Sequence, residues 1–180
     1  MKPIKSFNKW PFIGIFTLFF LIFYLSNSSS LMLGLSTEKL TKKSDVVVEG
    51  EVEDTISEWS KDGKKIITSA YIIVSDVIKG VMPNYKITVE YEGGSVGNLE
   101  LQVSDGVHLS KGERVIVFLK EGKSKKKGTV YKIVGKSQGK YTIDKDGIAR
   151  KQGFSIVQGE KVIDNNIPVE ELVEKVRRVE

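Results

Sequence analysis

The chain has 180 residues, of which 40% are hydrophobic and 28% charged, and its net charge is +5. Length and composition fit one globular domain with a short extra segment. The absence of Cys and the single His108 exclude a disulfide-stapled scaffold, a CxxC redox motif and a zinc site of Cys and His ligands. Three of the 28 basic residues are Lys2, Lys5 and Lys9, so residues 37–180 contain 25 basic and 23 acidic side chains, and this near balance gives no reason to expect a nucleic-acid partner.

An uncharged apolar run over residues 12–25 follows the three lysines. Its length is that of a signal-peptide core and is below the roughly 20 residues of a spanning helix, and small serines at residues 26–30 follow as cleavage positions. Alternatively, residues 31–35 extend the run to an uncleaved anchor, with membrane contact through residues 10–35. Both interpretations make residues 1–36 a signal peptide or N-terminal membrane anchor. The remainder is then secreted or anchored on the outer side of the cytoplasmic membrane.

Residues 37–180 are predicted to be one mainly β domain that begins with a short helix over Thr37–Lys43. Two long strands rich in Val and Ile follow, Asp45–Trp59 and Lys65–Lys79. The Asp-Gly pair in Lys61–Gly63 supplies the positive backbone angles of a tight reversal, which predicts a hairpin between them.

Apolar and polar residues alternate with period two over the next predicted strand, Tyr85–Tyr91. The odd-numbered residues are therefore expected to face the core, and Lys86, Thr88 and Glu90 the solvent. Five shorter strands complete the series: Leu99–Val103, Arg114–Lys120, Thr129–Val134, Lys140–Ile143 and Ile148–Lys151.

An amphipathic helix is predicted at the C-terminal end, over residues 168–178. Pro168 suits its first turn, and Leu172 and Val176 fall on one apolar stripe at helical spacing. Glutamates come early and arginines late, as the helix dipole favours. We expect the stripe to pack on the sheet.

Six spaced blocks carry a family resemblance: Leu40–Gly50, Trp59, Val77–Gly80, Gly93–Gly97, Lys111–Leu119 and Val134–Tyr141. In this order, over residues 37–145, they resemble an exported prokaryotic domain of uncharacterised function, which occurs alone behind a signal peptide or beside extracellular modules such as metalloproteases. The resemblance implies a small closed or partly open OB-like β-barrel and implies no reaction. The lysine-rich stretch Lys123–Lys127 departs from the family pattern as an insertion.

The candidate binding or structural residues lie in two glycine turns and at one tryptophan. Gly93, Gly94 and Gly97 lack the Lys-Ser/Thr ending of a phosphate loop, so we expect a β-bulge or barrel corner with at least one positive φ. We expect this loop to lie near the turn that contains Gln138 and Gly139. Trp59 is either a stacking platform for a sugar or base, or a core residue that closes one end of the barrel.

Three further features have ordinary structural explanations. Asp144–Gly147 resembles part of a calcium loop, but Gly153 occupies the position of the closing Glu, so a hairpin turn remains. Lys123–Lys127 is either a contact for anionic headgroups and wall polymers or a solvated hairpin tip. His108 has only Asp105 nearby as a second ligand, so we expect a surface or half-buried histidine.

These features predict an exported, non-catalytic β-barrel module of binding or structural type, without metal or cofactor. Its partner would be an extracellular protein or a cell-envelope component. One alternative is an accessory or inhibitor domain acting on an extracellular protease. Another is a carboxylate-dependent extracellular hydrolase that uses Glu90 with Glu92, or Glu49 with Glu51, because residues two apart share one face of a strand.

Overall fold

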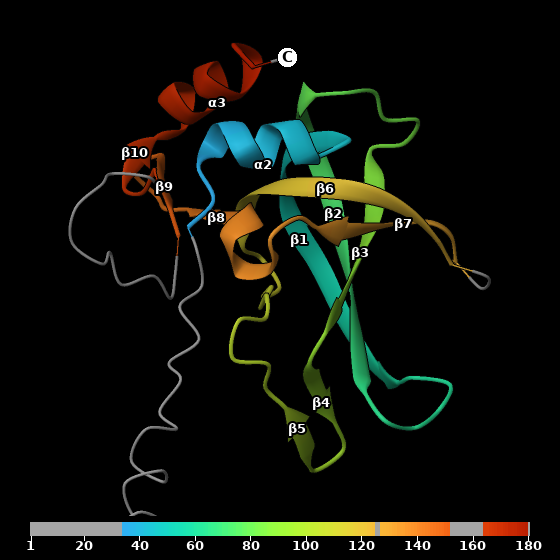
Figure 1. The fold of residues 1–180 in the computed structure, drawn as a ribbon. Helices are drawn as coiled ribbons and strands as arrows, with labels where there is room; N and C mark the ends of the chain where they lie inside the picture. Colours follow the sequence, from blue (N-terminus) through green and yellow to red (C-terminus); the bar gives the residue numbers. More distant parts are fainter. Residues whose placement is uncertain (1–33, 125–126, 152–163, 180) are drawn as a thin grey trace, which may run out of the picture. The chain divides into compact units, whose positions relative to one another are not determined.

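The computed structural model describes residues 34–124, 127–151 and 164–179 (Figure 1). This part of the chain is mainly β, with one short helix near each end: α2 (Thr37–Lys43) and α3 (Val169–Arg177). Both helices and the β class were predicted. The proposed signal peptide or anchor, with its apolar run, lies outside the described residues. Among the helices that are described, none has the length and hydropathy needed to cross a membrane.

All strands but two occur where the sequence predicted them, with shifted ends. In chain order they are β1 (Val46–Trp59), β2 (Ile66–Lys79), β3 (Lys86–Glu92), β4 (Gly94–Val96), β5 (Leu99–Leu101), β6 (Arg114–Ser124), β7 (Gly128–Ile133), β8 (Lys140–Ile143), β9 (Ile148–Arg150) and β10 (Ile167–Pro168). A 3-10 turn, η1 (Lys136–Gly139), lies between β7 and β8. The elements β4, β10 and η1 were not predicted: β4 lies in the glycine loop that was expected to be a bulge or corner, and Pro168 of β10 was assigned to the C-terminal helix.

Five of these strands pair in a ring. β1, β2 and β3 are antiparallel neighbours, β7 pairs with β6, and β6 pairs back to β1 over Val46–Glu51. The remaining link is a parallel pairing of β3 with β7 through one bridge, Val89 to Tyr131. Three register shifts interrupt the pairing of β1 with β2, and such irregularities bend a strand and favour closure of the ring. Gly50 allows the Ile73 carbonyl of β2 to approach closely.

One apolar core fills the inside of the ring. It is formed by alternate residues of the ring strands and by two residues of the connection before β6: Val46, Val48, Val52, Ala70, Ile72, Val74, Ile87, Val89, Val107, Leu109, Val115, Val117, Leu119 and Tyr131. The β4–β5 hairpin forms a separate two-stranded sheet.

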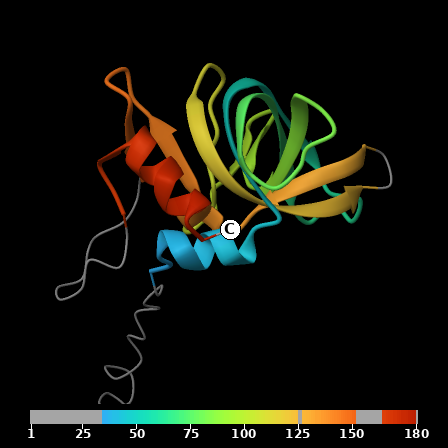
Figure 2. The same ribbon diagram turned by 90° about the horizontal axis from the view of Figure 1, so that it is seen from above.

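A second core lies on the outer face of β1 and β6. It contains Leu40, Val47, Ile78, Ile116, Phe118, Tyr141, Ile143, Ala149, Leu172 and Val176. Figure 2 shows α2 and α3 together on one flank of the ring, where they supply part of this layer. Both faces of β6 are therefore covered, which explains why its apolar residues form an unbroken run from Val115 to Leu119.

Three local expectations need correction. Ile87 and Val89 are 4% and 0% exposed and Lys86 is exposed, which confirms the predicted parity at these positions. Glu90, predicted to face the solvent, is partly buried, with its side chain 20% exposed beside Lys127. Tyr85, predicted to be buried, is 82% exposed because it precedes the strand. Pro168 belongs to β10 and caps α3, so it does not lie in the first helical turn.

Candidate functional site

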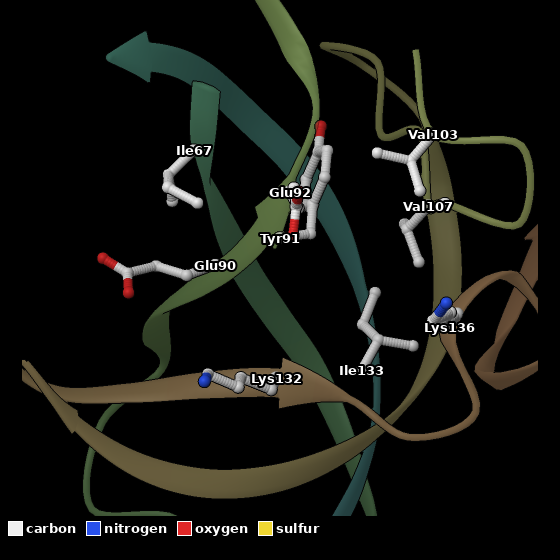
Figure 3. A pocket seen from close by; sticks show the side chains of 10 residues that line it. Ile67, Glu90, Tyr91, Glu92, Val103, Val107, Lys132, Ile133 and Lys136 are labelled. Atoms are coloured by element: carbon white, nitrogen blue, oxygen red, sulfur yellow. The ribbon is translucent and has the colours of Figure 1, made fainter. Parts of the chain in front are cut away.

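The ring has an opening between β3 and β7, where the two strands share no pairing beyond their single bridge (Figure 3). A cavity of about 370 Å³ occupies this opening. Its lining comes from β2, β3, β7, the connection between β5 and β6, and the first residue of η1: Ile67, Glu90, Tyr91, Glu92, Val103, Gly106, Val107, Lys132, Ile133 and Lys136.

The inner wall of the cavity is apolar and continuous with the core of the ring. Tyr91 and Ile133 pack against that core and Val107 belongs to it. Figure 3 shows Val103 and Val107 across the cavity from Tyr91. The Tyr91 hydroxyl accepts a hydrogen bond from the Leu109 backbone N–H at 3.3 Å, and burial raises the pKa of the phenol. Tyr91 is therefore a neutral, fixed wall of the opening.

Charged side chains form the rim, and most of them are paired. Glu90 lies 3.4 Å from the Lys127 ammonium and Glu92 lies 2.9 Å from that of Lys65. Lys136 pairs with Asp105. Within the described ranges, Lys132 is the one rim charge without an ion pair.

The glycine turn after β3 is a corner, as predicted. Gly93, Gly94 and Gly97 have φ values of 114°, 117° and 60°. The Thr68 hydroxyl donates to the Gly93 carbonyl at 2.5 Å and lies 2.8 Å from the Ser57 hydroxyl. Gly94 packs so closely on these two hydroxyls that no side chain fits there. The corner borders a polar cleft of about 410 Å³ that the exposed His108 also lines.

The turn with Gln138 and Gly139 has a packing role. The Gln138 Oε1 accepts the Leu35 backbone N–H at 2.5 Å, which ties the start of the domain to η1. A Cβ at Gly139 would collide with the Val134 carbonyl oxygen. This turn was expected to lie near the Gly93–Gly97 corner, but segment 101–109 lies between them. Gly93 packs on Leu101 of that segment, and the Asp105 carbonyl accepts the Ser137 N–H at 3.3 Å.

Trp59 is 44% exposed, so the interpretation that it closes a barrel end is wrong. It stands at the last position of β1, where the hairpin turn keeps it outside both cores. Trp59 borders a hollow of about 270 Å³ together with Lys61, Ser124 and Lys127.

Lys127 was predicted to belong to a solvated hairpin tip, but its side chain lies over the surface of β1, β2 and β3. Its ammonium donates to Glu58 at 3.0 Å and to the Ser69 hydroxyl at 2.6 Å. Lys123 of the same tip is exposed.

The carboxylates considered for a hydrolase are mostly held by cations. Besides the two pairs at the rim, Arg114 donates to Glu49 at 2.9 Å, and Glu51 is exposed. The Asp144 turn is the predicted hairpin, since its carboxylate accepts the Ile148 and Asp146 N–H groups. No group of three potential metal-ligating side chains occurs in the described part of the chain.

The opening between β3 and β7 was not predicted. Val103 was taken as the end of a strand and residues 104–113 as a connection, so the roles of Val103, Val107 and Lys132 were missed. The available signal is the pair Val107 and Leu109, two apolar residues at strand spacing within this connection. No family model matches the chain, and a search of curated proteins finds no match. A ligand for the opening therefore has to be inferred from the residues that line it and from their geometry.

Proposed function

We propose that residues 37–180 are an exported, non-catalytic, OB-like module that binds a ligand in the opening between β3 and β7. The pairing order β1-β2-β3-β7-β6, with β6 returning to β1, supports a five-stranded and partly open barrel of OB-like shape. The lysines and apolar run in residues 1–25 support export, as argued from the sequence. A cell-envelope component is the partner that this location favours.

The observation that carries the proposal is an apolar cavity that reaches the core through a gap in the ring. Sheets normally close such gaps with a paired strand or a covering element, because an open strand edge leaves backbone groups without partners. Here the segment with Val103 and Val107 borders the gap and a cavity of about 370 Å³ remains. Concave, mostly apolar sites of this size with a few polar groups are typical of ligand binding.

Saturable binding of a neutral fluorescent probe, phenylnaphthylamine, tests the proposal on the full chain. We expect one class of binding sites in the wild type. Val103→Phe should weaken binding about tenfold or more, because the larger ring fills the cavity. Val81→Phe is the matched control, since Val81 is 88% exposed and does not line the cavity.

Circular dichroism and thermal midpoints establish that each variant is folded. If Val103→Phe does not fold, Ile133→Phe fills the same cavity from the β7 side. Absence of saturable binding to the folded wild type, or unchanged binding in both filled variants, would overturn the proposal.

A further inference from the structure

We infer that the ligand of the β3–β7 opening is a single-chain anionic amphiphile, with its apolar chain in the cavity and its anionic head beside Lys132. This inference rests on the proposed function and names the ligand class of the same site. Its basis is the arrangement of charges around an apolar interior, which Figure 3 shows with Lys132 and Lys136 on either side of Ile133.

The charges on the rim leave one cation for a ligand. Glu90 and Glu92 are neutralised by Lys127 and Lys65, and Lys136 by Asp105. Lys132 is exposed and forms no ion pair with any residue that the structure describes. An anion that enters the mouth therefore meets an ammonium group that is in no ion pair among residues 34–124, 127–151 and 164–179.

A second lysine beside Lys132 strengthens the argument. Lys120 of β6 lies directly opposite Lys132 in the β6–β7 register, and both side chains are exposed. Like charges at directly opposite positions destabilise a strand pair. Glu121, the adjacent acid, stands opposite Tyr131 and so lies on the other face of the hairpin. An anionic head between the two ammonium groups would relieve their repulsion.

The cavity accounts for the apolar part of the ligand. The side chains of Tyr91, Val103, Val107 and Ile133 offer it no charged group. Its volume of about 370 Å³ lies near the lower end for small-molecule sites, which favours one chain over a bulky ring system. Each buried methylene contributes about 0.8 kcal/mol, so the chain supplies affinity and the head supplies selectivity.

Decanoate, decanol and decyltrimethylammonium share one chain length and differ in head charge, and their displacement of phenylnaphthylamine below their micelle concentrations tests the inference. We expect decanoate to bind about tenfold more tightly than decanol, and the cation to bind least. A higher salt concentration should reduce the affinity difference between decanoate and decanol, because salt screens the charges of exposed lysines.

Lys132→Gln should remove most of the affinity difference between decanoate and decanol and leave decanol binding unchanged. Lys123→Gln is the matched control, because Lys123 is an exposed lysine of the same hairpin that does not line the cavity. Lys120→Gln should weaken decanoate binding to a smaller degree.

The outcomes separate this inference from the proposed function. Equal affinities for the three amphiphiles, or a Lys132→Gln variant that binds decanoate like the wild type, would overturn the anionic ligand and leave the binding site intact. Failure of the neutral probe and all three amphiphiles to bind would overturn both. Binding to anionic vesicles without binding of monomeric decanoate would indicate a membrane surface instead, and would also overturn the inference.

Discussion

Lys151 has its ammonium group buried without a hydrogen-bond partner within the part of the chain that the structure describes. The side chain is 6% exposed, and its nitrogen lies 4.4 Å from the centre of the Tyr141 ring. Burial lowers the pKa of this ammonium from 10.5 to about 8, although the Asp164 carboxylate acts in the opposite direction. The cation–π contact with Tyr141 offsets only part of the lost hydration.

This burial predicts a stability that increases with pH. Between about pH 8 and pH 10 the unfolded chain binds the Lys151 proton while the folded protein has released it, so the free energy of unfolding should rise with pH in that range. The expected gain is about 2 kcal/mol between pH 8 and pH 9.5. Urea denaturation at a series of pH values measures it.

The control for this prediction is Lys151→Met, which retains the apolar stem and removes the charge. The variant should be more stable than the wild type at pH 7, and its stability should lack the rise above pH 8. Parallel pH profiles for the two proteins would show that Lys151 is not the group responsible.

Gly94 and Gly97 provide a comparison within one turn. Both have positive φ, but only Gly94 packs against side chains, the hydroxyl groups of Thr68 and Ser57. Gly94→Ala should lower the free energy of unfolding by about 2–4 kcal/mol through strain and overpacking. Gly97→Ala, with open space around it, should lower it by only about 1 kcal/mol. Equal effects in thermal or urea unfolding would contradict the packing explanation.

At the scale of elements, α3 is held to the domain by one apolar stripe. Leu172 and Val176 are fully buried in the outer core, and Val173 is partly buried beside it. The helix has nine residues and would be marginal alone, so this packing supplies most of its stability.

Leu172→Ala should therefore lower the free energy of unfolding by about 2–5 kcal/mol, because it removes buried methyl groups and leaves a cavity. Val173→Ala removes a similar apolar group at a half-exposed position of the same helix and should have less than half of this effect. Urea denaturation of both variants provides the measurement. An effect of Leu172→Ala no larger than that of Val173→Ala would mean that α3 is not anchored by its stripe.

For the whole molecule, the structure provides two packed cores as the source of stability. The sequence has no cysteine and one histidine, and the described ranges contain no cluster of metal-ligating side chains. We therefore expect EDTA to leave the thermal midpoint unchanged. A decrease of several degrees, reversed by added calcium or zinc, would reveal a metal that contributes to folding.

Predictions that depend on neighbouring residues were mostly correct, whereas predictions that depend on segments distant in the sequence were mostly wrong. Alternation placed Ile87 and Val89 correctly, because the inward and outward positions of a strand repeat every two residues. The same reasoning misplaced Tyr85, where the chain had not yet entered the sheet. Lys127 was also misjudged, since its partners Glu58 and Ser69 come from strands distant in the sequence. Of the two interpretations of Trp59, the core position was wrong because the end of β1 lies outside both cores.

The sequence by itself determined every strand except β4 and β10, the β1–β2 and β8–β9 hairpin turns, both helices and the positive φ of the glycine corner, because each depends on neighbours a few residues away. Only the tertiary structure decided that β6 returns to β1 and that β3 meets β7 at a single bridge. Those pairings join segments about 40 to 70 residues apart, and their geometry depends on how the bent strands twist around a shared core. The opening, with Lys132 on its rim, exists only as a result of that geometry.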